Sequence, residues 1–210
     1  MIRSFSNTTK SFFLLVVAVG AVFIGRHQPG PLENVPSYRQ KGPADAPVVL
    51  HEFSDLQCGR CADVQKHIDA LLAANPGKVR LVFHHYPLPM HKFSAKAAEA
   101  SECAGAQGKF WEMASALFAT QKKWEEMEDP SLFFAQTAKE LGLDVKTFET
   151  DFKSGRFKAG IEQDKKQGDS LPVSATPTFL MNDRVIVGDS QFQAFAQRFL
   201  TLELEKSDRE

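Results

Sequence analysis

Residues 47–61 read PVVLHEFSDLQCGRC and place a pair of cysteines shortly after an apolar run. Pro47 to Phe53 carry apolar side chains on both sides of an extended chain, which predicts a strand buried on both faces. A short turn leads to Cys58 and Cys61, and residues 62–74 then repeat apolar side chains with the period of a helix. The sequence therefore predicts a strand, a CxxC pair and a helix in direct succession.

The rest of the chain predicts further strands and helices around this unit. A second apolar strand is closed by Pro87, and a strand-helix-strand unit of this kind is normally parallel and right-handed. The elements that the pattern predicts after the first helix are a strand at 79–86, a helical stretch from 92 to 167 with several breaks, a hairpin of strands at 176–181 and 184–187, and a closing helix at 191–205. This order predicts an α/β protein with a thioredoxin fold that contains a helical insertion.

The spacing of Cys58 and Cys61 predicts a redox-active pair. Two cysteines three residues apart on the first turn of a helix bring their sulfur atoms within disulfide range. The unpaired amides of a helix start and the positive charge of Arg60 favour a thiolate at Cys58. We therefore expect Cys58 to be the attacking sulfur and Cys61 the shielded resolving thiol, with Gly59 and Arg60 as the residues that modulate the pair.

A zinc half-site and two unrelated core thiols are the alternatives to redox chemistry. Zinc would need two more ligands at a suitable spacing, and the chain has no second CxxC. The nearest histidines in sequence are His84, His85 and His91, and the first two, as adjacent residues of a strand, point to opposite faces. We therefore expect no metal, and no cofactor apart from the Cys58–Cys61 disulfide itself.

Thr176-Pro177 opens the predicted hairpin and is the second candidate element of the site. In thioredoxin-like folds a cis-proline lies against the CxxC pair, and a proline at a strand start donates no amide hydrogen bond. We expect a cis bond before Pro177 and a backbone at Thr176 that is free to pair with a substrate strand. An ordinary trans proline in a turn is the alternative.

Glu52 is the third candidate, because it lies on the predicted buried strand next to Phe53. An acid in such a place should have a raised pKa and could relay a proton for Cys61. The alternative is a strand end at which Glu52 simply meets water. Cys103, the remaining cysteine, lies in an alanine-rich helical segment and is predicted to be a small packing residue.

Composition limits the class of protein. Three cysteines in 210 residues are too few for a disulfide-stapled scaffold, and a net charge of −1 argues against nucleic acid as the main partner. Eighteen phenylalanines against two tyrosines and two tryptophans predict a dry aromatic core. The composition is therefore that of a globular domain, and by itself it leaves open whether the cysteines do chemistry.

The N-terminal residues predict an export segment in front of this domain. Residues 11–25 are an uncharged, mostly apolar run, and Arg3 and Lys10 precede it in a predicted cytoplasmic segment, 1–10. The run suits a short uncleaved membrane anchor or a cleaved signal, and under both readings the rest of the chain lies outside the cytoplasm. The other segments that we expect are a linker at 26–46, the folded domain at 47–205 and a charged tail at 206–210.

Several motifs, in order along residues 40–203, resemble the DsbA-like branch of the thioredoxin superfamily. They are GPADAP (42–47), EFSD (52–55), CGRC (58–61), YPLP (86–89), AAEA (97–100), GKFW (108–111) and ATPTF (175–179). The resemblance implies a periplasmic or cell-surface thiol:disulfide oxidoreductase, with Cys58 as nucleophile, Cys61 as resolving cysteine, Pro177 as the cis-proline and Glu52 as the buried acid. The chain departs from the best-known strong oxidant of the family at Gly59-Arg60, where that protein has proline and histidine.

Three functions fit these expectations. The first, which we expect, is a monomeric dithiol oxidase, in which the Cys58–Cys61 disulfide accepts electrons from paired thiols of unfolded exported proteins. A redox partner in the membrane would re-oxidise it. The second is a reductase that runs the same chemistry backwards, and the third is a copper- or zinc-handling protein of the same fold.

Overall fold

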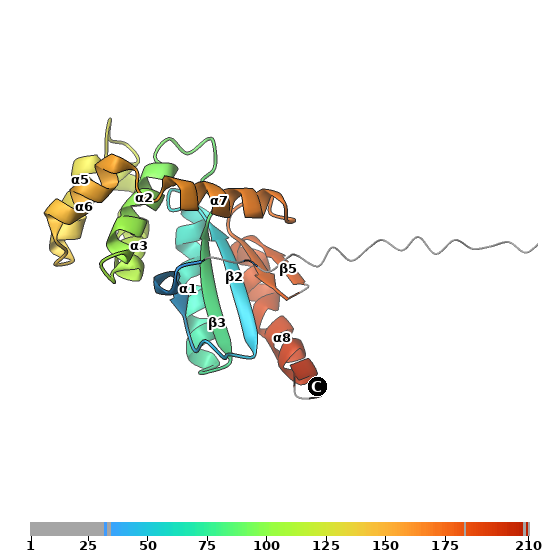
Figure 1. Cartoon of the computed structure of the whole chain (residues 1–210). Helices are drawn as coiled ribbons and strands as arrows, with labels where there is room; N and C mark the ends of the chain where they lie inside the picture. Colours follow the sequence, from blue (N-terminus) through green and yellow to red (C-terminus); the bar gives the residue numbers. More distant parts are fainter. Residues whose placement is uncertain (1–31, 33–34, 183, 208, 210) are drawn as a thin grey trace, which may run out of the picture.

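The structure is a computed structural model and describes residue 32, residues 35–182, residues 184–207 and residue 209. Its centre is a five-stranded mixed sheet in the order β1-β3-β2-β4-β5 (Figure 1). The strands are β1 Gln40–Lys41, β2 Val48–Ser54, β3 Val79–His85, β4 Thr178–Met181 and β5 Arg184–Val187. β2 pairs in parallel with β3 and antiparallel with β4, so the strand that leads to the cysteines lies in the middle of the sheet.

Eight α-helices surround the sheet in the part of the chain that the structure describes, and one 3-10 turn precedes it. They are η1 Ser37–Arg39, α1 Gly59–Ala74, α2 Ser94–Gly105, α3 Phe110–Ala119, α4 Gln121–Trp124, α5 Ser131–Glu140, α6 Val145–Ser154, α7 Lys158–Asp169 and α8 Gly188–Ser207. α1 and α8 pack on one face of the sheet, where Leu50, Ile68 and Leu200 meet in one buried cluster. α7 contacts β3 and runs across the end of the sheet in Figure 1.

Helices α2 to α7 form the predicted insertion between β3 and β4. Its core is aromatic and continuous with the cysteine pair, because Phe110 and Trp124 share one buried cluster with Cys58 and Cys61. Phe83 of β3 extends this cluster by an edge-to-face contact with Phe110, with ring centroids 5.3 Å apart. Among the described residues the phenylalanines are therefore used for packing, as predicted, and several of them share one buried cluster with the cysteines.

The predicted elements are confirmed, with small shifts at their ends. Among the strands, β2 covers 48–54 rather than 47–53, β3 ends at 85 rather than 86, and β4 begins at 178 rather than 176. Among the helices, α1 begins at 59 rather than 62, and α8 covers 188–207 rather than 191–205. The apolar pattern of α1 starts only at 62, but the start at 59 with Cys58 as N-cap agrees with the prediction that both cysteines lie at the beginning of a helix. α8 extends past the predicted domain end at 205 and takes in the first two residues of the predicted charged tail.

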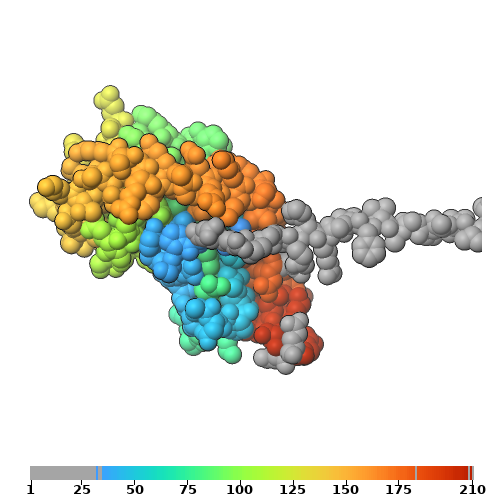
Figure 2. Space-filling view, viewed as in Figure 1, coloured from blue at the N-terminus to red at the C-terminus, as the bar shows by residue number. Residues whose placement is uncertain are grey.

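The predicted linker at 26–46 is wrong in its last part, and the folded domain begins before residue 47. Ser37–Arg39 form a 3-10 turn, and Gln40–Lys41 form β1, which pairs antiparallel with β3. The prolines and glycines of this stretch predict a linker, and a strand of two residues is too short to show a periodic pattern. In the space-filling view these residues, in blue, lie directly against the orange surface of the helical insertion (Figure 2).

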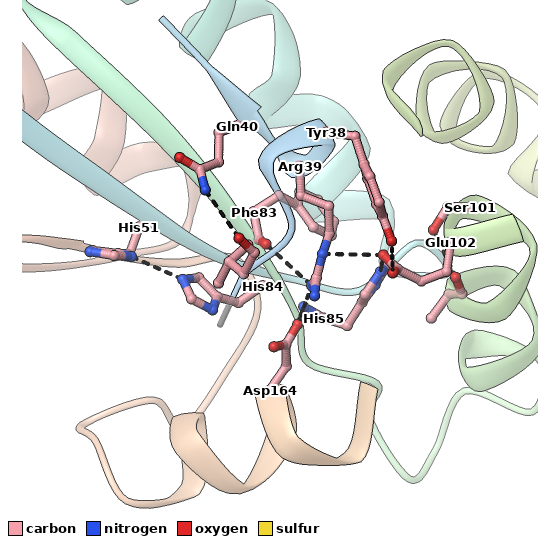
Figure 3. Close-up of polar contacts among 12 residues, drawn as sticks. Tyr38, Arg39, Gln40, His51, Phe83, His84, His85, Ser101, Glu102 and Asp164 are labelled. Carbon is pink, nitrogen blue, oxygen red and sulfur yellow. Dashed lines mark hydrogen bonds and ion pairs between the residues drawn. The ribbon is translucent and has the colours of Figure 1, made fainter. Parts of the chain in front are cut away.

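A buried ionic cluster holds this N-terminal segment to the domain. Arg39 is 3% exposed and forms ion pairs with Asp164 of α7 and with Glu102 of α2, whose Oε1 is 3.2 Å from Arg39 Nε. Glu102 also accepts a hydrogen bond from Tyr38 at 2.8 Å and lies 3.1 Å from His85 Nε2 (Figure 3). We call these five residues the Arg39 cluster, and they explain why the segment is part of the fold.

The predicted cytoplasmic segment 1–10 and the apolar segment 11–25 lie outside the described residues, as does most of 26–34. The anchor and the cleaved signal therefore both stay predictions. None of the helices that the structure describes is long and apolar enough to cross a membrane.

Candidate active site

Cys58 and Cys61 lie at the N-terminus of α1, close to the end of β2. Cys58 is the N-cap residue, and its carbonyl oxygen accepts the Cys61 N–H at 3.0 Å. Cys61 lies inside the first turn and is fully buried, whereas Cys58 is 8% exposed. Both side chains are thiols. The more accessible sulfur is therefore that of Cys58, the residue predicted to attack.

The two thiols have pKa values that are shifted in opposite directions. The hydrogen bond with the Cys61 thiol is the main cause that lowers the pKa of Cys58, while burial raises it. Contacts with Thr176 and with the backbone N–H groups of Cys61 and Arg60 lower it further, to about 6. Burial is the main cause that raises the pKa of Cys61 well above its ordinary value. At neutral pH the pair therefore consists of a Cys58 thiolate and a Cys61 thiol.

Of the two residues between the cysteines, Arg60 acts on Cys58 through its backbone. Arg60 is exposed, and among the main causes that lower the pKa of Cys58 it contributes its backbone N–H. The predicted cause was its guanidinium charge. Gly59 has open space where a Cβ would lie, so no steric reason requires a glycine there.

The Thr176–Pro177 peptide bond is cis, as predicted. Because β4 pairs with β2, the residues that precede β4 lie beside the start of α1. The Thr176 carbonyl oxygen lies 3.5 Å from Cys58 Sγ and accepts a hydrogen bond from it when Cys58 is protonated, although the two residues are 118 positions apart. The Thr176 hydroxyl is buried close to Cys58 and is the part of Thr176 that helps to lower the pKa of Cys58. The fold thus brings the predicted proline element to the predicted cysteine pair.

Glu52 is fully buried on β2, as predicted. The side-chain amide of Gln65 donates to Glu52 Oε1 at 2.9 Å and to the Cys61 carbonyl oxygen at 3.1 Å, while Glu52 Oε2 has no partner in the described part of the chain. Burial raises the pKa of Glu52 to about 7, although the Ser54 hydroxyl and the Gln65 amide oppose the rise. Glu52 can therefore hold or release a proton near neutral pH, and Gln65 connects it to the backbone of Cys61.

Gln121 of the helical insertion also belongs to the site, and the sequence does not indicate it. Its side-chain amide donates to the Leu56 carbonyl oxygen at 2.7 Å and to the Cys58 carbonyl oxygen at 3.1 Å. It thereby holds residues 55–58, which we call the redox loop. A glutamine 63 positions from Cys58 carries no local pattern that would predict this contact. Gln65 has a weak signal, because it lies one helical turn after Cys61.

The histidines that could have completed a metal site lie in separate places. His84 and His85 point to opposite faces of the sheet, as predicted: His84 Nε2 lies 2.9 Å from His51 Nδ1, and His85 joins the Arg39 cluster. Within the described residues no group of three or more potential metal ligands is found. Cys103 is fully buried, and burial raises its pKa, which agrees with the predicted packing role.

Comparisons with known proteins point to one family. A family model described as thioredoxin matches residues 35–199. The chain is also 35% identical over 157 residues to the Na(+)/H(+) antiporter NhaA 3 of Salinispora tropica, a match that covers 74% of this chain and 23% of the antiporter. The chain thus spans about a quarter of the length of the curated relatives that it matches.

Two solved structures illustrate the similarity of fold. Oxidised BdbD from Bacillus subtilis is 25% identical with a TM-score of 0.70, and the match covers 80% of this chain and 92% of BdbD. The thiol-disulfide exchange protein alpha-DsbA2 from Wolbachia pipientis is 21% identical with a TM-score of 0.68, and the match covers 83% of this chain and 90% of that protein. The family match begins at residue 35, which agrees with the docked N-terminal segment and not with a domain boundary at 47.

Proposed function

Because this chain belongs to the thioredoxin family and has a DsbA-like fold, we propose that it is a protein thiol:disulfide oxidoreductase that uses Cys58 and Cys61. The observation that carries the proposal is the difference between the two thiols. The partly accessible Cys58 has a pKa of about 6, and the buried Cys61 keeps its proton. Thiol exchange needs this combination, because the attacking sulfur must be a reachable thiolate and the resolving thiol must be shielded.

In the proposed direction the Cys58–Cys61 disulfide oxidises a pair of substrate thiols. A substrate thiolate forms a bond to Cys58 Sγ, the disulfide breaks, and its electron pair leaves on Cys61 Sγ. The second substrate thiolate then attacks the substrate sulfur of this mixed disulfide and releases Cys58 as a thiolate. The substrate ends with a disulfide, and the protein ends with a Cys58 thiolate and a Cys61 thiol.

The low pKa of Cys58 supports oxidation as the main direction. A stabilised Cys58 thiolate stabilises the reduced protein, and this makes the disulfide a stronger oxidant. The value of about 6 lies between the nucleophile pKa of thioredoxin, about 7, and that of DsbA, about 3.5. The same atoms also support a reductase, which is the second candidate, and the reduction potential separates the two.

We assign supporting roles to Glu52, Thr176 and Pro177. Cys61 leaves with a high proton affinity, and Glu52, with a pKa of about 7, is suited to supply the proton. Pro177 has no N–H, so its cis peptide leaves the Thr176 backbone beside Cys58 as the proposed pairing position for an extended substrate.

The proposed substrates are reduced or unfolded exported proteins, and the proposed oxidant is a redox partner in the membrane. Both rest on the predicted export segment at 11–25 and on the DsbA-like fold. Outside the cytoplasm, in a periplasm or at a cell surface, disulfides persist once they have formed. We propose that the domain works there as a monomer that is anchored or secreted by its N-terminus.

The equilibrium of Cys58–Cys61 with glutathione, together with a spectroscopic titration of the Cys58 thiolate, tests this function. We expect a potential closer to about −120 mV, as in DsbA, than to about −270 mV, as in thioredoxin. Thiolate absorbance should be lost as the pH falls through about 6. Cys58→Ser should abolish exchange and Cys61→Ser should trap mixed disulfides, whereas Cys103→Ala is the matched control. Failure of the unaltered protein to exchange with glutathione would exclude the function, and a potential near that of thioredoxin would favour the reductase.

A further inference from the structure

Asp55 contacts both cysteines through its backbone. It follows β2 directly, begins the redox loop and is 1% exposed. Its N–H donates to Cys61 Sγ at 3.5 Å, and its carbonyl oxygen accepts the Cys58 N–H at 2.9 Å. The N–H is therefore aimed at the sulfur atom that receives negative charge when the Cys58–Cys61 bond breaks.

The Asp55 carboxylate fixes this backbone in place. Oδ1 accepts the Gln57 N–H at 2.8 Å and the Ser94 hydroxyl at 2.6 Å. Oδ2 accepts the Leu88 N–H at 2.9 Å and lies 2.7 Å from His91 Nδ1. A carboxylate offers about four acceptor sites, so the group is fully used. Its partners come from the redox loop itself, from the loop after β3 and from the first turn of α2.

A second contact binds the same two segments together. The Phe93 N–H donates to the side-chain oxygen of Gln57 at 2.7 Å. The redox loop therefore cannot move relative to residues 88–94 unless several hydrogen bonds break at once. Gln121 also holds the loop, through the carbonyl oxygens of Leu56 and Cys58.

We propose that Asp55 is a positioning residue for thiol exchange, whose carboxylate holds the loop so that its own N–H stabilises the departing Cys61 thiolate. The inference rests on the proposed function. When a substrate thiolate bonds to Cys58 Sγ, the electron pair of the broken disulfide moves to Cys61 Sγ, where the N–H already lies. A donor that is fixed in advance lowers the barrier, because nothing has to reorganise during the step. Cys61 is fully buried, so bulk water does not replace this donor.

Asp55→Asn tests the carboxylate at nearly constant size. The asparagine amide keeps one acceptor oxygen, but its NH2 group faces donors such as the Leu88 N–H and cannot accept from them. The redox loop therefore loses some of the hydrogen bonds that hold it. We expect the rate at which glutathione reduces the Cys58–Cys61 disulfide to fall about tenfold or more, in line with the loss of a fixed donor in other enzymes. A lower stability with an unchanged rate would show that Asp55 is merely structural, and would overturn the proposal.

Asp129→Asn is the matched control for this substitution. Asp129 also accepts a backbone N–H and a hydroxyl from Ser131, at 3.0 and 2.6 Å, and a lysine, Lys96, at 2.9 Å. It does so in an exposed loop and without a contact to either cysteine. The control should reduce the disulfide at the rate of the unaltered protein, and an equal slowing in both variants would contradict a specific role for Asp55.

His91 provides a milder pair of variants that applies even if Asp55→Asn does not fold. His91→Ala removes one donor to Asp55, and the loss of one hydrogen bond corresponds to about a two- to tenfold slower reduction. His91→Asn places an uncharged N–H donor close to the position of Nδ1 and should restore most of the rate. No slowing in His91→Ala would count against the proposal, as would a failure of His91→Asn to restore the rate.

A spectroscopic signature separates this inference from the proposed function. In Cys58→Ser, NMR can follow the Asp55 amide proton while Cys61 is titrated with base. The amide resonance of this variant should shift together with the ionisation of Cys61, whether or not the unaltered protein has exchange activity. If the unaltered protein exchanges with glutathione but the amide of the variant does not shift, the inference is overturned. If the amide shifts but the unaltered protein does not exchange, only the proposed function is overturned.

Discussion

The cysteine site and the Arg39 cluster are both buried polar sites of one domain, but they differ in charge balance. In the Arg39 cluster, Arg39 and His85 face the carboxylates of Glu102 and Asp164. Burial pushes the pKa of Glu102 upward, but the contacts with His85 and Arg39 outweigh it and lower the pKa. At the cysteine site the hydrogen-bond partner of Glu52 is a neutral amide, and burial raises the pKa of Glu52 to about 7.

This difference shows that burial alone does not determine what a buried acid does. Glu102 is 3% exposed and Glu52 is fully buried, so their solvent exposure is nearly the same. A paired carboxylate keeps its charge and joins segments, whereas an unpaired one exchanges its proton close to neutral pH. We interpret the Arg39 cluster as a structural clamp and the environment of Glu52 as part of the reactive site.

Among the substitutions that test this comparison, Arg39→Met should have the largest effect on the free energy of unfolding. It leaves Glu102 and Asp164 buried without their guanidinium partner, and breaking a buried ion pair typically costs about 3–5 kcal/mol. Urea unfolding should show this loss, while the rate of glutathione exchange per folded molecule stays unchanged. A slower exchange at unchanged stability would assign the clamp to the reactive site instead.

Lys41→Met is the control within the same segment. Lys41 pairs with Asp69 on the surface, where the two side chains are 35% and 65% exposed. Exposed pairs contribute less than about 1 kcal/mol, so the free energy of unfolding should change little. A cost as large as that of Arg39→Met would mean that any change in this segment unfolds the domain.

Glu52→Gln should have the next largest effect on the free energy of unfolding, and above neutral pH it should stabilise the protein where Arg39→Met destabilises it. Between pH 4.5 and about 7 the folded protein keeps a proton on Glu52 that the unfolded chain releases, so stability falls as the pH rises through this window. The free energy of unfolding that is lost across this pH window is about 3 kcal/mol. Glutamine cannot ionise and can still accept the bond from Gln65, so the variant should be more stable than the unaltered protein above neutral pH. Near pH 4 the two should unfold alike, and urea titrations across the pH range measure both limits.

Glu102→Gln, in the Arg39 cluster, should change the pH dependence of stability in the direction opposite to Glu52→Gln. Because the pKa of Glu102 is lowered in the fold, its contribution is present above the ordinary value of 4.5 and is lost as the pH falls through the lowered value. The variant should be less stable than the unaltered protein at neutral pH, and the gap should narrow in acid. If both glutamine variants changed the pH dependence in the same direction, the contrast between the two sites would fail.

Among the substitutions of buried residues, Cys103→Ala should have the smallest effect on the free energy of unfolding. Cys103 packs in the same apolar cluster as Cys58 and Cys61 and follows Glu102 in the chain. The loss of one buried sulfur should cost about 1 kcal/mol, the usual size for a point mutant, in thermal or urea unfolding. The glutathione exchange rate should stay unchanged, and a changed rate would give Cys103 a part in the chemistry.

Local sequence patterns are sufficient to predict the elements that build the cysteine site. The apolar run of β2, the CxxC spacing and the apolar face of α1 each lie within a few residues, so the burial of Glu52 and the position of Cys58 follow from them. The cis bond before Pro177 can be predicted only after the fold has been predicted, because most X-Pro bonds are trans. These are also the parts of the prediction that are confirmed.

The contacts between distant residues are not predictable in this way. Nothing near Arg39 in the sequence distinguishes it from the half-buried Lys41, and its partner Asp164 lies 125 positions away. The partners of Gln121 and most partners of the Asp55 carboxylate are also distant in sequence. Sequence patterns report which face of an element is apolar, whereas a buried charge is explained only by the opposite charge that the fold brings to it.

The order of the sheet has a consequence for aggregation. Among the described strands, the two edges are β1 with two residues and β5 with four. A long open edge adds unfolded chains as extra strands, and short edges and charged residues oppose this. A protein that is proposed to handle unfolded chains meets such strands at every turnover, and Lys41 and Arg184 add charge to its two edges. The brevity of its edges should therefore let it release client chains instead of co-aggregating with them.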